Sequence, residues 1–192
     1  MTRDEYRRRL SSRRVGIAGA GGLGSNCAAA LARAGVRALV IADFDLVSRD
    51  NLDRQFYFLD QVGLPKVEAL AANIARIDPG VVVEAVRARL DADSAAALFA
   101  GCDAVVEAFD SAEAKAMLIE AVLSRLPGTP LVTASGIAGY GSLDALRARR
   151  SGSLFVVGDL ESEVGPDRPP MAPRVAMAAA MEADAVLQAL LG

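Results

Sequence analysis

The chain has 192 residues, of which 53% are hydrophobic, and a formal net charge of −3 at pH 7. This length and apolar content suit one sizeable core, and we expect residues 1–192 to form a single domain. The acidic balance argues against nucleic acid as a partner, because duplex binding needs a basic stripe that neutralises phosphates. The absence of histidine from the sequence excludes a Ser-His-Asp triad, a Cys-His pair and imidazole metal ligation.

The cysteines and the N-terminal residues indicate the compartment. Cys27 and Cys102 form no Cys-x-x-Cys pair, so neither a zinc site nor a disulfide framework is expected. The first ten residues, MTRDEYRRRL, are too charged to begin a secretory signal or a membrane span. We therefore expect a soluble, cytoplasmic protein with reduced thiols, no zinc and no membrane partner.

Buried-strand and helix patterns alternate along most of the chain. An apolar run over 14–18 leads into GAGGLGS, after which Ala and Leu recur at helical spacing until Gly35. The strand pattern returns over 38–41, and the polar loop LVSRDNLDRQFYF follows. Further helices are expected over 65–77, 94–99 and 112–126, and further strands over 81–86, 104–106 and 130–133. This order predicts a Rossmann-like α/β fold, a mostly parallel sheet with helices on both faces.

The pattern changes in the C-terminal quarter. Short segments punctuated by glycine over 136–158 predict a small antiparallel C-terminal extension. ESEVGPDRPPMAP has the composition of a loop, and a closing helix is expected to begin at Pro173. Glu182 and Asp184 interrupt that helix, which favours packing on the core over a membrane span.

A glycine-rich turn is the first candidate site. The segment GAGGLG fits the G-x-G-x-x-G fingerprint and falls between an expected strand and an expected helix. Glycines let the backbone approach phosphates, and a helix N-terminus offers unpaired N–H groups to an anion. We expect Gly19, Gly21, Gly22 and Gly24 to bind a nucleotide, with a purely structural turn as the alternative. The fingerprint does not identify the nucleotide.

Acidic residues follow the second expected strand. Asp43 lies about twenty residues beyond the last glycine, where a carboxylate typically accepts hydrogen bonds from ribose hydroxyls. Asp45 is a second candidate in the same site. The alternatives are a capping or solvated role for Asp43 and stabilisation of the following loop by Asp45.

Cationic and amide side chains come next along the chain. Arg54 can contact phosphate oxygens in a bidentate manner, and Lys66 can supply a compact positive charge. Asn51 and Gln55 lie beside Arg54 in sequence. An NAD(P)-dependent oxidoreductase would share the glycine turn and the ribose aspartate, but it gives these groups no common purpose. For each cation alone, an ordinary surface position is the alternative.

The segments GAGGLGS, ADFDLVSRDNLDRQ, GLPKVEA and EAFDS together resemble the ThiF/MoeB/HesA family, relatives of the ubiquitin-activating enzymes. The resemblance covers nearly the whole chain, and MAPRVAMAAAMEADAVLQALLG is similar to the closing helix of short ThiF-like members. Family members use ATP and Mg²⁺ to adenylylate the C-terminal glycine of a small ubiquitin-like sulfur carrier. The resemblance therefore implies an adenylyltransferase that acts as a homodimer on a ThiS-like carrier ending in Gly-Gly, in thiamine biosynthesis.

Carried over residue by residue, the resemblance implies that Asp43 holds the ribose and Asp110 the magnesium ion. Arg54 and Lys66 would contact the triphosphate, with Asn51 and Gln55 lining the same site. Arg54, Lys66 and Asp110 would then be the catalytic residues, because the charge that develops on the phosphates needs cations and a metal. The alternative for Asp110 is an N-cap of the helix that follows.

The sequence also departs from the family. The paired zinc motifs and the crossover cysteine of larger relatives are missing. Cys27 falls in the first helix after the glycine turn and Cys102 precedes an expected strand, so we expect both to be buried and not nucleophilic. The family places an arginine of the partner subunit in the site, for which the candidates are Arg7, Arg8 and Arg9. An exposed basic turn is the alternative for these arginines. A regulatory subunit that binds a nucleotide without turnover is a further alternative for the whole protein.

Overall fold

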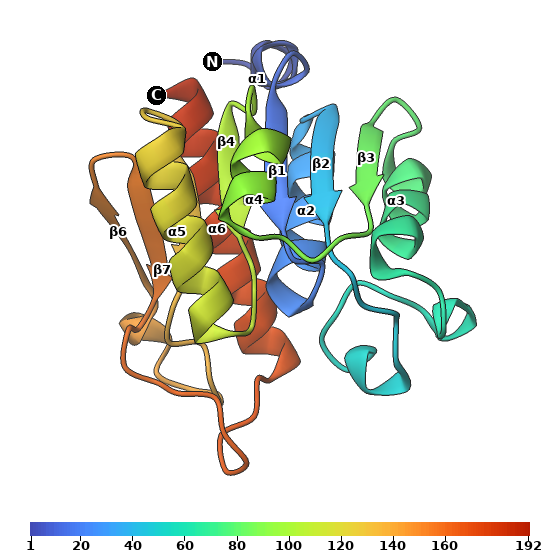
Figure 1. The fold of residues 1–192 in the computed structure, drawn as a ribbon, viewed down its shortest axis with the longest axis vertical. Helices are drawn as coiled ribbons and strands as arrows, with labels where there is room; N and C mark the ends of the chain where they lie inside the picture. The colour runs from blue at the N-terminus through green and yellow to red at the C-terminus, as the bar shows by residue number, and fades with distance from the viewer.

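The computed structural model describes residues 1–192, apart from the side chain of Leu143, and its centre is a seven-stranded sheet (Figure 1). The strands are β1 (Arg14–Ala18), β2 (Ala38–Ala42), β3 (Val82–Val86), β4 (Ala104–Glu107), β5 (Leu131–Ala134), β6 (Arg147–Ser151) and β7 (Leu154–Gly158). They lie in the order β3-β2-β1-β4-β5-β7-β6, and neighbours are parallel except for β6 and β7. The expected Rossmann-like α/β fold with a small antiparallel extension is confirmed.

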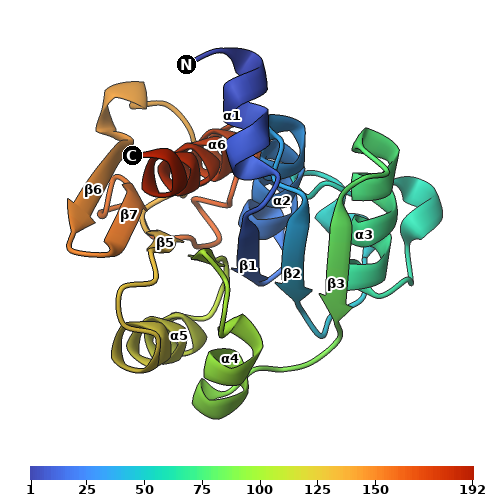
Figure 2. The ribbon, with the colours of Figure 1, turned by 90° about the horizontal axis from the view of Figure 1, so that it is seen from above.

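Helices cover both faces of the sheet. They are α1 (Arg3–Leu10), α2 (Gly22–Ala34), α3 (Lys66–Ile77), α4 (Ala92–Phe99), α5 (Ala112–Arg125) and α6 (Ala172–Leu191). Short 3-10 turns lie at η1 (Arg49–Asn51), η2 (Leu59–Gln61) and η3 (Leu143–Ala145). Viewed from above, α2, α3 and α6 lie on one face and α4 and α5 on the other (Figure 2). The buried side chains form two clusters, one on each face of the sheet.

The chain order creates a switch point in the sheet. Strand β1 pairs with β2 on one side and with β4 on the other. The chain therefore winds outward from β1 through β2 and β3 and then crosses over to β4. Ligands of open α/β sheets bind at such a point, beyond the carboxyl ends of the strands. The segments that follow Ala18, Ala42 and Glu107 meet there.

Helix α1 is the one α-helix that the sequence analysis did not predict. Thr2 caps it through a hydrogen bond from the backbone N–H of Glu5, and the Glu5 carboxylate accepts from the N–H of Thr2. This capping box, Thr-x-x-Glu, was the available signal. The other expected helices and strands agree with the structure to within two residues at each end.

The cysteines and the closing helix behave as expected. Cys27 and Cys102 are buried, and burial raises the pKa of both thiols. Helix α6 packs closely against α2 and against the neighbouring strands. Across the part of the chain that the structure describes, no helix combines the length and apolar character needed to cross a membrane.

A candidate nucleotide site at the glycine turn

Close backbone packing explains two of the glycines in the turn. Gly19 has φ +100°, and a Cβ there would lie 2.7 Å from the carbonyl oxygen of Ala108. A Cβ at Gly24 would lie only 1.9 Å from the carbonyl oxygen of Gly19. Helix α2 begins at Gly22 with Gly21 as its N-cap. As a glycine, Gly21 has no side chain to cap the helix, so the N–H groups of the first turn are available to an anion.

The Arg54–Gln55 segment lies beside this turn. The atom nearest to a Cβ built on Gly21 is Nε2 of Gln55, at 3.9 Å. A Cβ built on Gly22 would lie 3.8 Å from Cγ of Arg54. The amide oxygen of Gln55 is buried and has no hydrogen-bond partner among the described residues. A buried acceptor without a donor is a polar group that a bound ligand can satisfy.

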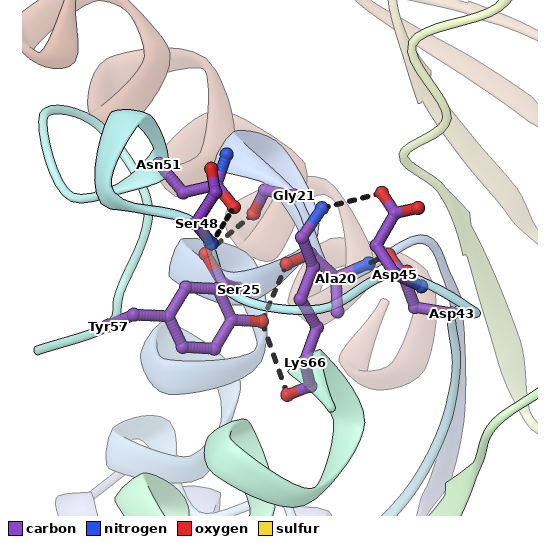
Figure 3. A network of polar contacts seen from close by, with 9 residues as sticks. All are labelled: Ala20, Gly21, Ser25, Asp43, Asp45, Ser48, Asn51, Tyr57 and Lys66. Atoms are coloured by element: carbon purple, nitrogen blue, oxygen red, sulfur yellow. Dashed lines mark hydrogen bonds and ion pairs between the residues drawn. The ribbon is translucent and has the colours of Figure 1, made fainter. Parts of the chain in front are cut away.

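Asp43 joins the end of β2 to the turn. The residue is 8% exposed, and one carboxylate oxygen accepts from the backbone N–H of Ala20 at 2.7 Å. The other oxygen accepts from the N–H of Asp45 at 2.8 Å (Figure 3). Asp43 therefore accepts hydrogen bonds from nearby backbone N–H groups, and it also lies beside the glycine turn, where a ribose ligand is expected. Each carboxylate oxygen keeps a further lone pair that can accept from a ribose hydroxyl.

Lys66 pairs with Asp45. Its ammonium group lies 2.8 Å from a carboxylate oxygen of Asp45, and Figure 3 shows the two side chains pointing toward one another. The Lys66 side chain is 8% exposed, whereas that of Asp45 is 48% exposed. The backbone N–H of Lys66 also donates to the carbonyl of Asp45 at 3.0 Å. This contact holds the start of α3 against the segment that follows β2.

Tyr57 connects Lys66 to the glycine turn, a role that the sequence analysis missed. Its hydroxyl donates to the carbonyl oxygens of Ala20, at 2.7 Å, and Lys66, at 3.3 Å (Figure 3). Burial, followed by the charges of Asp43 and Asp45, raises the pKa of Tyr57, so the hydroxyl keeps its proton. No periodic pattern indicated this residue, because it lies in a loop.

Arg54 and Asn51 make local contacts. The Arg54 guanidinium donates to the carbonyl of Asp50 at 3.1 Å and lies 2.7 Å from a carboxylate oxygen of Asp53. Its side chain is 27% exposed, so it is half-buried at the rim of the turn. The amide oxygen of Asn51 accepts from the N–H of Ser48 at 3.0 Å (Figure 3). Asn51 therefore shapes the loop, whereas Arg54 keeps donors that can face a phosphate.

Two side chains of α2 hold this loop in place, and the sequence analysis missed both. The side-chain amide of Asn26 donates to the carbonyl of Arg54 at 3.0 Å and to that of Gly22 at 2.7 Å. The Ser25 hydroxyl accepts from the N–H of Phe56 at 3.0 Å. A small polar residue on an expected helix gives no signal for such a distant backbone partner.

Asp110 lies in the loop that follows β4. The residue is exposed, and among the described side chains its carboxylate takes part in no hydrogen bond or ion pair. Ser111 caps α5 by accepting from the N–H of Ala114, so the alternative that Asp110 is the N-cap is wrong. The described residues contain no group of three or more metal-ligating side chains. A lone carboxylate nonetheless fits Mg²⁺, which binds through one or two carboxylates, substrate phosphates and water.

The structure brings most of the predicted residues to one end of the sheet. The glycine turn contacts the Arg54–Gln55 segment and the backbone of Ala108, while Asp43 and Tyr57 bond directly to Ala20. Helix α1, which carries Arg7, Arg8 and Arg9, lies at the opposite end of the sheet (Figure 1). The guanidinium of Arg9 donates to the carbonyl of Leu191 at 3.0 Å. These three arginines are therefore not part of the site in their own chain.

Two proteins of known name are similar to this chain in sequence over part of their length. The SAMP-activating enzyme E1 of Haloferax volcanii is 43% identical over 125 residues, which are 65% of this chain and 46% of the relative. The molybdopterin-synthase adenylyltransferase of Escherichia coli is 44% identical over 103 residues, 53% of this chain and 41% of the relative. The chain thus spans less than half the length of these relatives.

A solved structure matches over a greater share. The Escherichia coli tRNA N6-threonylcarbamoyladenosine dehydratase in complex with AMP superposes with a TM-score of 0.87 and 25% identity. The match covers 97% of this chain and 89% of that one. The model of the ThiF family matches residues 1–192. With that match over the glycine turn and every strand of the sheet, the chain belongs to the ThiF family.

Proposed function

We propose that residues 1–192 form a single nucleotide-binding domain that adenylylates the C-terminal glycine of a small ubiquitin-like carrier protein, with ATP as the adenylyl donor. The observation that carries the proposal is the meeting of the Arg54–Gln55 segment, Asp43 and the Asp110 loop at one glycine turn. Two relatives are named as an adenylyltransferase and as an activating enzyme, and a structural neighbour binds AMP. These names support the same chemistry.

The reaction joins the carrier to AMP. A carboxylate oxygen of the carrier's terminal glycine attacks the α-phosphorus of ATP, the bond from that phosphorus to the β-phosphate oxygen breaks, and pyrophosphate leaves. The N–H groups at the start of α2 bind phosphate oxygens, and Asp43 accepts from the ribose. Arg54 and Lys66 stabilise the negative charge that develops on the phosphates. Lys66 exchanges its Asp45 partner for a phosphate oxygen in this scheme.

Asp110 would hold Mg²⁺ against the phosphates. When bound, the ion supplies charge neutralisation and orients the reacting groups in line. The remaining ligands would come from phosphate oxygens and water. Asn51 and Gln55 complete the lining, and the unpartnered amide oxygen of Gln55 is free to accept from the nucleotide.

The carrier is proposed to be ThiS-like, to end in Gly-Gly and to serve thiamine biosynthesis. The resemblance of the closing segment to short ThiF-like proteins supports this choice. A homodimer fits the position of α1, because Arg7, Arg8 and Arg9 reach a nucleotide only if they enter the site of another subunit. Since both cysteines are buried, no thioester or persulfide step on this chain is proposed.

Isotope exchange between pyrophosphate and ATP tests the activity. We expect exchange that requires both a ThiS-like carrier and Mg²⁺. The Asp110→Ala variant should lose at least 99% of the exchange, roughly the effect of removing one charge-stabilising group. Glu113→Ala, which removes another exposed carboxylate three residues away, is the matched control and should stay active. If both variants exchange at the wild-type rate, Asp110 is not part of the site.

The same assay separates the alternatives. An NAD(P)-dependent oxidoreductase would bind NAD(P) in a titration and give no exchange. A regulatory subunit would bind ATP without exchange. The coverage of the dehydratase structure favours one further candidate, the tRNA substrate named for that protein. Release of AMP that depends on tRNA carrying N6-threonylcarbamoyladenosine, and not on the carrier, would replace the proposal by that activity.

A further inference from the structure

A buried carboxylate lies next to the Asp110 loop. Glu107 is the last residue of β4 and is 0% exposed. One of its carboxylate oxygens accepts from the backbone N–H of Phe109 at 2.8 Å. The other accepts from the ammonium group of Lys115 on α5 and from the hydroxyl of Thr133 on β5. Every donor in this group therefore converges on a single side chain at the carboxyl end of the sheet.

These bonds fix the loop between β4 and α5. Glu107 holds the N–H of Phe109, while the carbonyl of Ala108 lies against Gly19. Ser111 caps α5 directly after the loop. Asp110 stands between these anchored residues, and its own carboxylate is exposed. Its position relative to the glycine turn is consequently set by its neighbours.

The Glu107–Lys115 ion pair is not the usual way to stabilise a position at the edge of a core. Burying a carboxylate and an ammonium group costs desolvation that their attraction only offsets, and well-packed apolar residues often stabilise a fold as well or better. Lys115 is also 24% exposed, so it reaches the surface beside the loop. Apolar side chains at these positions would pack the sheet, but they would leave the N–H of Phe109 without its acceptor. The polar group therefore supplies what apolar packing lacks, an acceptor that holds the loop in position.

We infer that Glu107, with Lys115 and Thr133, positions Asp110 for the metal ion that accompanies the nucleotide. The inference rests on the proposed function, because it assigns a purpose to the Asp110 carboxylate. Lys115 and Glu107 are positioning residues here and do not themselves touch the ion. Side chains that orient a metal ligand typically change metal affinity or activity by about 10- to 100-fold when they are removed.

Binding of Mn²⁺ in the presence of ATP, measured by electron paramagnetic resonance, tests the inference without turnover. Lys115→Met keeps the side-chain length and removes the charge, and we expect its Mn²⁺ affinity to fall about tenfold. ATP affinity in EDTA should not change. Lys115→Arg should restore Mn²⁺ affinity, because a guanidinium can also pair with Glu107. Arg125, on the same helix as Lys115, forms an exposed ion pair with Asp93 on α4, and Arg125→Met should bind Mn²⁺ like the wild type.

The outcomes are distinct from those of the proposed function. Wild-type affinity in a folded Lys115→Met variant would overturn the inference even if carrier-dependent exchange is found. Weakened Mn²⁺ binding in a protein without such exchange would support the positioning role and reject the adenylylation. If Lys115→Met fails to fold by circular dichroism, Thr133→Val decides the question, because it removes only the hydroxyl that donates to Glu107 and accepts from Lys115. Unchanged Mn²⁺ affinity in that variant would then overturn the inference.

Discussion

The ammonium group of Lys66 and the carboxylate of Asp45 lie 2.8 Å apart beside the glycine turn (Figure 3). The partners differ in exposure, because Lys66 is nearly buried and Asp45 is half exposed. Loss of the lysine charge therefore leaves Asp45 accessible to water and not trapped in the core. The pair thus keeps a nearly buried cation close to the glycine turn.

Replacing Lys66 by methionine should lower the rate of exchange while leaving the stability of the fold nearly unchanged. The buried stem is kept, so we expect a change in melting temperature of less than about 3 °C, the shift that roughly 1 kcal/mol produces in a chain of this size. Exchange should fall about 100-fold or more, since one charge-stabilising donor is lost. Asp45→Asn is the companion variant and should retain most of the exchange. A Lys66→Met enzyme with wild-type exchange would show that Lys66 serves only the Asp45 pair.

Alanine substitutions in the glycine turn should have two different effects. At Gly24 the new Cβ would meet the carbonyl of Gly19 at 1.9 Å, so the turn must distort and thermal stability must fall. At Gly21 the nearest atom is 3.9 Å away, so Gly21→Ala should melt like the wild type. If phosphates lie against this turn, Gly21→Ala should still weaken ATP binding in calorimetry. Unchanged ATP affinity would move the phosphates away from Gly21.

Glu182 gives a pH-dependent prediction. It is fully buried on α6, and both carboxylate oxygens have no hydrogen-bond partner among the described residues. Burial, and then the charge of Glu107, raises the pKa of Glu182 well above 4.5. The folded state thus holds a proton that the unfolded state releases above pH 4.5. The contribution of Glu182 to stability is therefore complete below pH 4.5 and is lost as the pH rises through the raised pKa.

Glu182→Gln should remove that dependence. The stability of the variant relative to the wild type should increase with pH above about 4.5, by up to about 1.4 kcal/mol per pH unit. Urea denaturation of both proteins at pH 5 and pH 8 measures the difference. The same difference at both pH values would mean that Glu182 has a partner in solution.

Arg174 and Asp159 anchor the segments around the hairpin of β6 and β7. The Arg174 guanidinium lies 2.5 Å from a carboxylate oxygen of Asp159 and donates to the carbonyl of Gly141 at 2.6 Å. The Arg174 side chain is 3% exposed and that of Asp159 is 11% exposed. Arg174→Met should cost about 3 kcal/mol, because it leaves a carboxylate buried without its counter-ion. A fall in melting temperature of roughly 10 °C would follow, to be measured by calorimetry.

Acid should weaken the same anchor. Burial acts to raise the pKa of Asp159, but hydrogen bonds from Ser162 and Glu161 and the charge of Arg174 outweigh it and lower the pKa to about 2. This contribution is complete above pH 3.8 and is lost as the pH falls toward 2. Asp159→Asn should lack this loss between pH 4 and pH 2 in urea denaturation. An equal acid response in both proteins would contradict the assignment.

The sequence predicted the winding of the parallel strands β1 to β5 because each is a short, mostly apolar run, and because apolar residues recur at helical spacing between them. The spacing of Gly19 and Gly24 predicted the turn for a local reason, since both positions lack room for a Cβ. The pairing of Lys66 with Asp45 was not predictable. It depends on the path of an aperiodic loop, whose ends meet where Leu46 pairs with Pro65. The role of Glu107 was hidden for a similar reason, because its partners come from β5 and α5.

Helix α6 completes the glycine turn from the far end of the chain. Val175 lies so close to Gly22 that a Cβ there would approach it to 2.9 Å, and the rest of α6 covers α2. During translation the residues of the turn are therefore synthesised early, whereas α6, which packs against them, is synthesised much later. A nascent chain that ends before α6 would present the apolar side of α2 to chaperones, and we expect it to hold no nucleotide until that last helix has emerged from the ribosome.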